Sequence, residues 1–409
     1  MQLYIDPGTG SMLFTVLIGI IGAGIYSIKM LWMKIRFKIS GGKVEKNDNK
    51  IPFVFFSDDK RYWQIFEPIC REMDKRGKDV VYMTASEDDP ALKNEYEHIR
   101  AEYIGKDNKA FAKLNFLNAT ILFSTTPGLD VYQWKRSKQV DYYVHIPHAS
   151  NDITRYRMFG IDYYDAILLS GEYQARDIRT LEKMRNLPPK ELSVVGIPYM
   201  DEMAARYEKA GPVKNKECNV MLAPSWGSSA IFGVYGGKII EKLVETGYHI
   251  IIRPHPQSWT SDKELIDKLM KDFPESEQIE WNKDADNFEV LRRADILISD
   301  FSGVTFDFSL IYNKPIIYTN PNYDLSPYDA WWLDNPPWTI SALPKLGREL
   351  TAENMGNIKE LIDTCLGDSK YEEGRKEVKA ETWKHYGRGA VNTAEYLINK
   401  YEELTEKGI

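Results

Sequence analysis

From residue 51 onward the chain alternates short apolar runs with segments of helical periodicity, and this alternation restricts the fold more than any other feature. Apolar runs that alternate with helices are typical of parallel strands buried under helices on both faces of a sheet. The first series of runs is predicted at 51–57, 79–84, 99–104, 119–124, 140–146, 166–170 and 193–195, and the second at 218–223, 249–252, 278–281, 296–299 and 315–318. The sequence therefore predicts an α/β fold of two facing Rossmann-like domains with a cleft between them.

The length of 409 residues suffices for two domains with cores of their own, which we expect at 51–212 and 213–409. The charged helical segment 354–409 either closes the second domain or crosses back to brace the first. A net charge of −7 argues against a nucleic-acid partner. The three cysteines lie far apart and without Cys/His spacing, which predicts reduced thiols and no zinc site.

The segment 12–28 is almost wholly apolar, and with the apolar residues 30–33 beyond Lys29 it is just long enough to span a bilayer. A cleaved signal peptide needs a basic region ahead of its apolar run, whereas the only charged side chain ahead of this run is Asp6. Lysine and arginine are concentrated after the segment instead. The positive-inside rule therefore places the N-terminus outside the cell and the remaining chain in the cytosol.

We accordingly expect a single-pass transmembrane anchor at 1–36 in the cell membrane and a basic linker at 37–50. The linker would hold the two domains against the anionic cytoplasmic leaflet. Gly19, Gly22 and Gly24 would let helices pack closely, so a homo-oligomer stays open.

The stretch 294–307 reads as a buried strand that runs through Ser-Asp-Phe-Ser-Gly into a helix. Such a turn offers free backbone N–H groups and the positive end of a helix dipole, and Gly303 lets a phosphate approach the main chain. Ser302 and Gly303 are therefore predicted to bind an anion. The alternative has equal weight on this stretch alone: Ser302 caps the helix and Asp300 satisfies a turn.

Two histidine-bearing stretches also follow predicted strands. Arg253 and His255 leave the strand 249–252 between two prolines, at the sheet edge where α/β proteins bind ligands. His148 follows the strand 140–146, and we interpret it as a general base or phosphate ligand because imidazole titrates near neutral pH. His145 and His148 could together bind a metal ion, but no carboxylate or third histidine lies at ligand spacing.

The turn after the strand 218–223 gives weaker signals. The hydroxyl of Ser225 could donate to a phosphate oxygen, and Trp226 could stack on a ring. The segment 196–201 is predicted to start a helix at Pro198 and to be mainly structural.

Five of these stretches together resemble the bacterial CDP-glycerol glycerophosphotransferases, which polymerise or prime teichoic acids and have a GT-B fold. The family pattern runs Trp-His-Gly, Gly-x-Pro-Arg-x-Asp, Ala-Pro-Thr-Trp-Arg, Arg-Pro-His-Pro, and Ser-Asp-Tyr-Ser-Ser with an Asp a few residues on. The chain has, in the same order, Pro147-His148-Ala149, Gly196-Ile197-Pro198-Tyr199-Met200-Asp201, Ala223-Pro224-Ser225-Trp226-Gly227, Arg253-Pro254-His255-Pro256, and Ser299-Asp300-Phe301-Ser302-Gly303 with Asp307. The resemblance covers roughly residues 140–320, and its last two motifs are the specific ones.

Three positions depart from the family pattern. Tyr199 and Gly227 stand where the family usually has arginine, and Ala149 replaces a glycine. The loss of two cations weakens the expectation of the usual donor or acceptor, because each arginine could pair with a phosphate. The expected fold is unaffected.

The resemblance implies transfer of an alditol phosphate, glycerol phosphate foremost, from a CDP-alditol to a hydroxyl of a lipid-linked or polymer acceptor in cell-wall or surface-polymer synthesis. The first domain would take the acceptor and the second the nucleotide donor. The donor pyrophosphate would lie over Ser302 and Gly303, with its charge neutralised by Arg253 and His255. His148 would deprotonate the acceptor hydroxyl, and CMP would leave.

The remaining motif residues would add substrate contacts: Ser225, Trp226, Ser299, Asp300 and Asp307. No cofactor is expected besides the donor substrate CDP-glycerol. Asp300 and Asp307 leave a magnesium ion open, although the sequence contains no dedicated metal cage.

Two alternatives remain at this stage. One is a GT-B glycosyltransferase that uses a nucleotide sugar and the same phosphate cradle. The other is a non-catalytic membrane-tethered protein that keeps the cleft for binding, as the missing arginines would allow.

Overall fold

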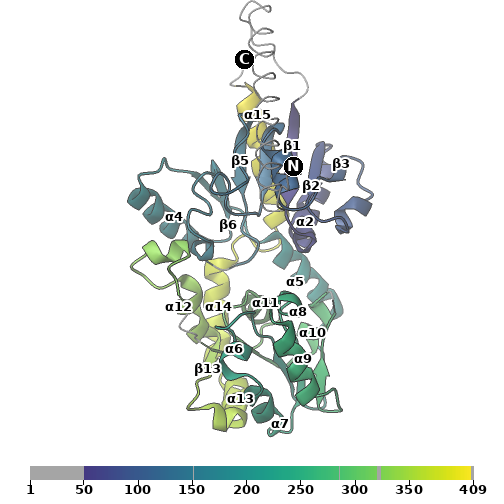
Figure 1. Ribbon diagram of the computed structural model, residues 1–409, viewed down its shortest axis with the longest axis vertical. Coiled ribbons are helices and arrows are strands. Elements are labelled where there is room, and N and C mark those ends of the chain that lie inside the picture. Colours follow the sequence, from purple (N-terminus) through teal and green to yellow (C-terminus); the bar gives the residue numbers. More distant parts are fainter. Residues whose placement is uncertain (1–49, 151, 285, 320–323, 407–409) are drawn as a thin grey trace, which may run out of the picture. The chain divides into compact units, whose positions relative to one another are not determined.

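The computed structural model describes residues 50–150, 152–284, 286–319 and 324–406, and every element below belongs to the compact unit Ile51–Ile409 (Figure 1). The predicted anchor at 1–36 and the predicted linker, apart from Lys50, lie outside the described residues. None of the helices within the described ranges is both long and apolar enough to cross a bilayer.

The first sheet has, among the described residues, seven parallel strands in the order β3-β2-β1-β4-β5-β6-β7. Their bounds are β1 (Ile51–Ser57), β2 (Val80–Thr84), β3 (Ile99–Tyr103), β4 (Asn118–Ser124), β5 (Gln139–His145), β6 (Ala166–Leu169) and β7 (Glu191–Val194). Successive residues of β1 point to opposite faces: Phe53 and Phe55 enter one hydrophobic core, and Val54 and Phe56 enter another. Both faces are therefore covered, as the apolar runs predicted.

The second sheet has six parallel strands within the described part of the chain, in the order β10-β9-β8-β11-β12-β13. They are β8 (Asn219–Leu222), β9 (His249–Ile252), β10 (Ile279–Trp281), β11 (Ile296–Ser299), β12 (Ile316–Tyr318) and β13 (Gly347–Glu349). The strand β13 was not predicted, because its sequence Gly-Arg-Glu contains no apolar run. The prediction of two parallel-sheet α/β domains is confirmed.

The helices follow the strands along the chain. They are α2 (Trp63–Lys75), α3 (Asn108–Leu114), α4 (Glu172–Arg185), α5 (Pro198–Ala210), α6 (Ile231–Tyr235), α7 (Lys238–Val244), α8 (Ser258–Ser261), α9 (Lys263–Asp272), α10 (Phe288–Arg293), α11 (Val304–Ile311), α12 (Trp338–Leu346), α13 (Ile358–Gly367), α14 (Lys370–Thr382) and α15 (Gly389–Glu406). Short 3-10 helices are η1 (Lys60–Tyr62), η2 (Pro90–Lys93), η3 (Ile153–Arg155), η4 (Asp329–Trp332) and η5 (Met355–Asn357).

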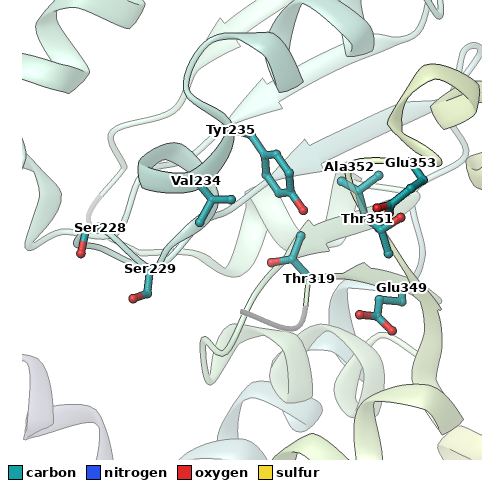
Figure 2. Close-up of a pocket in the computed structure, with 10 residues that line it drawn as sticks. Ser228, Ser229, Val234, Tyr235, Thr319, Glu349, Thr351, Ala352 and Glu353 are labelled. Carbon is teal, nitrogen blue, oxygen red and sulfur yellow. The ribbon is translucent and has the colours of Figure 1, made fainter. Parts of the chain in front are cut away.

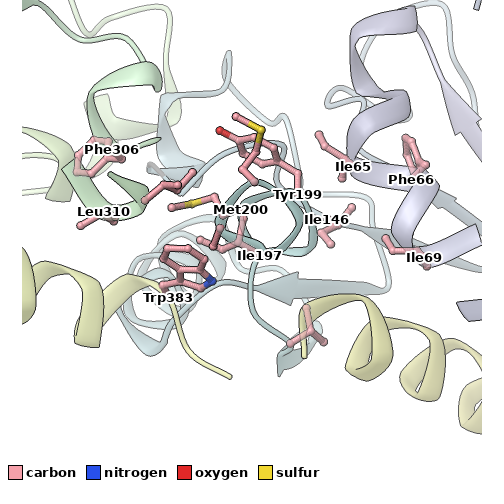
Figure 3. Close-up of a cluster of buried hydrophobic side chains, with 14 of the residues drawn as sticks. Ile65, Phe66, Ile69, Ile146, Ile197, Tyr199, Met200, Phe306, Leu310 and Trp383 are labelled. Atoms are coloured by element: carbon pink, nitrogen blue, oxygen red, sulfur yellow. The ribbon is translucent and has the colours of Figure 1, made fainter. Parts of the chain in front are cut away.

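The helix α5 joins the two halves, and it begins at Pro198 as predicted. It contacts α2 on one side and α11 on the other. Figure 3 shows Tyr199 and Met200 between Ile65 of α2 and Phe306 of α11, inside one continuous hydrophobic core. The shared core fixes the strand ends of one half relative to those of the other.

The C-terminal helices divide between the two halves. The helix α13 packs on β12 and β13 of the second sheet, whereas α15 packs on α2 and β4 of the first. The final helix thus crosses back to the first half, which was one of the two arrangements left open by the sequence. The predicted boundary between 212 and 213 falls in the segment that links α5 to β8.

Candidate active site

Both sheets have a topological switch point, where the chain leaves neighbouring strands in opposite directions. The switch lies between β1 and β4 in the first sheet and between β8 and β11 in the second. Ligands of open α/β sheets bind outside the carboxyl ends of the strands at such a point. The candidate site is therefore built from the loops that follow these four strands and from those after their neighbours β5 and β9.

Ser302 and Gly303 lie between β11 and the first turn of α11, and both are half-buried. Gly303 is the N-cap residue, and no side chain caps the helix by a hydrogen bond. The alternative in which Ser302 caps α11 is therefore wrong. The uncapped turn keeps the positive end of the helix dipole available to an anion.

Asp300 and Ser299 lie in the interior, each with no exposed surface. The Asp300 carboxylate accepts hydrogen bonds from the backbone N–H of Ser225, at 3.0 Å to Oδ1, and of Ile231, at 3.1 Å to Oδ2. The Ser299 hydroxyl donates to the carbonyl oxygen of Ala223 at 2.7 Å. In this structure both side chains hold the loop after β8 against the loop after β11, and we give them that supporting role.

The loop after β8 presents different residues to the interior and to solvent. Ser225 is only 6% exposed and is held by Asp300, whereas the Trp226 side chain next to it is 51% exposed. Gly227 has a φ of +90°, and its backbone N–H donates to Asp262 Oδ2 at 3.0 Å. Trp226 is thus the residue of this loop with a free ring face.

Arg253 and His255 follow β9, as predicted. The Arg253 guanidinium donates to the side-chain oxygen of Asn282 and, at 2.8 Å, to the carbonyl oxygen of Asp284. The Nδ1 atom of His255 accepts a hydrogen bond from the Gln257 backbone N–H at 3.1 Å, so the neutral ring carries its proton on Nε2. Burial, with the nearby positive charge of Arg61 as a second cause, lowers the His255 pKa to about 4. At neutral pH His255 is an uncharged hydrogen-bond donor.

His148 follows β5 and is half-buried. Its ring lies 5.2 Å from the Tyr62 ring and 6.0 Å from the Tyr156 ring. Burial, and then the charge of Arg61, lowers the His148 pKa to about 4, so the imidazole is neutral and can accept a proton. Its Nδ1 atom is buried and has no hydrogen-bond partner among the described residues.

His145 lies behind His148 and has no exposed surface. Its Nε2 atom is 3.2 Å from the Tyr156 hydroxyl, and burial lowers its pKa to about 3. The structure therefore separates the two histidines of this loop: His145 belongs to the interior, and His148 lies nearer the surface.

The His148 loop meets the first turn of α11. A Cβ atom placed on Gly303 would lie 3.6 Å from the Cβ atom of Ala149, the residue after His148. Farther along the same loop, the Arg155 guanidinium donates to the Phe301 carbonyl oxygen at 2.9 Å. The predicted base from the first half and the predicted anion site from the second are thus neighbours.

Arg61 is a site residue that the sequence did not reveal. It lies in η1, directly after β1, and its positive charge lowers the pKa of both His148 and His255. Its Nε atom donates to Asp59 Oδ1 at 2.9 Å, and its side chain is 46% exposed. The residue lies in the charged stretch Asp-Asp-Lys-Arg, which resembles an ordinary solvated loop. Only the strand order brings that loop to the switch point.

Asp307 is half-buried, and its carboxylate is bound to a protein group. Its carboxylate is hydrogen-bonded to the hydroxyl of Tyr199, and burial raises the Asp307 pKa to about 7. Tyr199 itself is 7% exposed and lies in the core between the two halves. We therefore assign Asp307 to the contact of α5 with α11. A magnesium ion at Asp300 and Asp307 was left open by the sequence, and in the structure the two carboxylates are bound to different protein groups.

A cavity of about 420 Å³ lies beyond the carboxyl ends of β12 and β13. Figure 2 shows Tyr235 and Thr319 facing one another across it. Hydroxyl and carboxylate groups line much of its wall, from Ser228, Ser229, Tyr235, Thr319, Glu349 and Glu353. No predicted site residue lines this cavity, and no group of three or more His, Cys, Asp or Glu side chains in the described residues is placed to hold a metal ion.

Two parallel-sheet domains, with histidine, arginine and an uncapped helix N-terminus at their strand ends, define a GT-B-like protein. The family model described as CDP-glycerol:poly(glycerophosphate) glycerophosphotransferase matches residues 38–331, and the chain belongs to this family. It is thus an enzyme of the CDP-glycerol glycerophosphotransferase type, and the resemblance drawn from the five motifs is confirmed.

Individual relatives are distant. The teichoic acid glycerol-phosphate primase of Bacillus subtilis (strain 168) is 23% identical over 330 residues, which are 76% of this chain and 78% of the primase. A structure of the wall teichoic acid polymerase TagF matches with a TM-score of 0.57 at 15% identity, covering 93% of this chain and 99% of the other. A structure of S. aureus MnaA with UDP matches with a TM-score of 0.59 at 11% identity, covering 87% and 97%. The structural matches support the GT-B-like fold.

Proposed function

We propose that this enzyme transfers glycerol phosphate from CDP-glycerol to a hydroxyl of a lipid-linked or polymer acceptor and releases CMP. The observation that carries the proposal is the junction of the His148 loop with the first turn of α11, where Ala149 and Gly303 are neighbours. A phosphate over that turn would lie beside a neutral imidazole. The teichoic acid primase among the relatives supports an acceptor in cell-wall polymer synthesis.

The transfer is a single displacement at phosphorus. The oxygen of the acceptor hydroxyl attacks the phosphorus that carries the glycerol, and a new P–O bond forms. The bond from that phosphorus to the bridging oxygen of CMP breaks, and CMP leaves with the electron pair. The hydroxyl proton passes to the imidazole of His148. Positioning and electrostatic stabilisation supply most of the acceleration in such reactions.

His255 acts from the donor side. Its Nε2–H is available because Nδ1 is held by the Gln257 backbone. The uncharged ring can donate this proton in a hydrogen bond to a phosphate oxygen at neutral pH. The predicted anchor at 1–36 would keep the two domains at the cytoplasmic leaflet, where a lipid-linked acceptor is presented.

The test is release of CMP from radiolabelled CDP-glycerol by the full chain in detergent, with and without a lipid-linked acceptor. We expect acceptor-dependent release that falls about 10²–10³-fold in His255→Ala and in His148→Ala. His98→Gln is the matched control, because His98 is a surface residue paired with Asp79 on the first sheet. A loss below tenfold would remove the substituted histidine from the active site. Turnover of a nucleotide sugar without turnover of CDP-glycerol would replace the proposal by sugar transfer, and donor binding without any turnover would indicate a binding protein.

A further inference from the structure

The loop after β1 occupies the switch point of the first sheet, opposite the predicted donor site. Asp58, the first residue of this loop, accepts a hydrogen bond from the Thr126 hydroxyl at 2.9 Å. Because Thr126 follows β4, this bond spans the carboxyl ends of the two strands that flank the switch. Arg61 lies three residues farther along, at the place where the topology predicts a ligand.

Arg61 and His148 flank the same aromatic ring. The Arg61 guanidinium carbon is 6.0 Å from the centroid of the Tyr62 ring, and the His148 ring centroid is 5.2 Å from it. The cation and the proposed base thus both lie beside one aromatic ring. A phosphate within reach of His148 would lie close to this cation.

The site needs a fixed positive charge, and the histidines do not supply one. Both have a pKa of about 4, so at neutral pH they are uncharged. Arg253 and Arg155 keep their charge, but each already donates to oxygen atoms of the second half: Arg253 to Asn282 and Asp284, and Arg155 to Phe301. A transferring phosphoryl group concentrates negative charge on its oxygens, which a preorganised cation stabilises.

Arg61 is able to change partners. It is paired with Asp59, which lies two residues away on the same open loop, at 2.9 and 3.1 Å. Solvent screens this pair, because the Arg61 side chain is 46% exposed. The same guanidinium fork that holds the two Asp59 oxygens matches two oxygens of a phosphate, so a phosphate can take the place of the carboxylate.

We propose that Arg61 is a catalytic residue that binds the non-bridging oxygens of the phosphoryl group being transferred, from the acceptor side of the cleft. The inference rests on the proposed function for the identity of the donor. The binding of a phosphate group by Arg61 rests only on its place at the switch point, beside Tyr62 and His148.

The test compares Arg61→Ala and Arg61→Lys with Lys60→Gln in the full-length protein. Lys60 is a matched control because it is the preceding residue, bears the same charge and is paired with Asp88 instead. We expect kcat/KM for CDP-glycerol to fall about 10²–10³-fold in Arg61→Ala, at least tenfold in Arg61→Lys, and less than threefold in Lys60→Gln. Added guanidinium ion is expected to restore part of the turnover of Arg61→Ala, which a purely structural role would not produce. A fall in kcat/KM of less than tenfold in Arg61→Ala overturns the proposal. If the alanine variant does not fold, the same tenfold limit is applied to Arg61→Lys.

A second measurement separates this proposal from the proposed function. Inorganic pyrophosphate is titrated into the wild-type protein and both Arg61 variants by calorimetry. If the wild-type protein does not turn over CDP-glycerol, CDP-glycerol is not the donor. The titration then tests phosphate binding by Arg61 independently of the donor. Pyrophosphate binding at least tenfold weaker in Arg61→Ala than in wild type supports the phosphate contact, and equal binding, or none in wild type, overturns it.

Discussion

The pair of Tyr199 and Asp307 gives a pH-dependent prediction for Asp307→Asn. The asparagine keeps the size and the hydrogen-bonding oxygen of the carboxyl group but cannot ionise. In the native protein, burial raises the Asp307 pKa to about 7, above the value of about 4 expected in the unfolded chain. Between these two values the native state binds one proton more than the unfolded state.

The sign of the effect follows from proton linkage. Because the folded pKa is the higher one, the stabilisation that Asp307 contributes is complete below about pH 4 and is lost as the pH rises through the folded pKa of about 7. The free energy of unfolding falls by at most about 1.4 kcal/mol for each pH unit. From pH 5 to pH 8 this amounts to roughly 3 kcal/mol as an upper bound. Asp307 is half-buried, so screening by solvent reduces the expected difference to about 1.5 kcal/mol.

Thermal unfolding of the full chain in detergent measures this difference. We expect the Tm of Asp307→Asn, relative to wild type, to be about 2 °C higher at pH 8 than at pH 5. Any effect of the substitution that does not depend on charge cancels between the two pH values. Asp272→Asn, on the exposed surface of α9, is the control and is expected to give the same Tm difference at both. An equal shift of Asp307→Asn at pH 5 and pH 8, or a larger one at pH 5, would refute the reasoning.

Three further predictions concern the site and its support. Since burial and the charge of Arg61 lower the His148 pKa to about 4, kcat/KM should stay level from about pH 6 to pH 9 and fall below about pH 5. A fall in kcat/KM centred near pH 6.5 would contradict the role of His148 as the base. Arg253→Lys keeps the charge but loses the guanidinium fork that binds Asn282 and Asp284. KM for the donor should rise about tenfold, and kcat should stay within threefold of the wild-type value. A large fall in kcat with an unchanged KM would instead argue for a role in the transition state. Asp201→Ala removes the acceptor of the Trp383 indole N–H and of the backbone N–H groups of Gly387 and Gly389. The free energy of unfolding should fall by roughly 3 kcal/mol, with a lower Tm and faster proteolysis of residues 384–389. An unchanged Tm would show that water replaces the carboxylate.

The fold was predictable where burial leaves a mark on the sequence. The strands β9 and β11 are runs of isoleucine and leucine closed by polar residues, and both were predicted with the bounds that the structure gives them. Burial on both faces of a parallel sheet produces such runs. The strand β13 has no such run, because it lies at the sheet edge and pairs only with β12 within the described residues.

The site was predictable only as a set of strand ends. A motif places Asp300 after β11, but its burial and its bonds to the backbone of Ser225 and Ile231 depend on the packing of two loops that lie far apart in the sequence. Arg61 was missed for the converse reason. Its neighbours in sequence are charged, and its neighbours in space, His148 and His255, are supplied by different sheets.

The two arginines missing from the family pattern have different consequences. Position 199 lies in the core between the two halves, where Tyr199 bonds Asp307, so an arginine there would pair with that carboxylate and not with a substrate. Position 227 is open, because a Cβ atom on Gly227 would meet nothing within 4 Å. The first departure therefore changes an interdomain contact, and only the second removes a cation from an accessible loop. If Arg61 binds the phosphoryl group as proposed, it supplies a cation from the opposite sheet that offsets this loss.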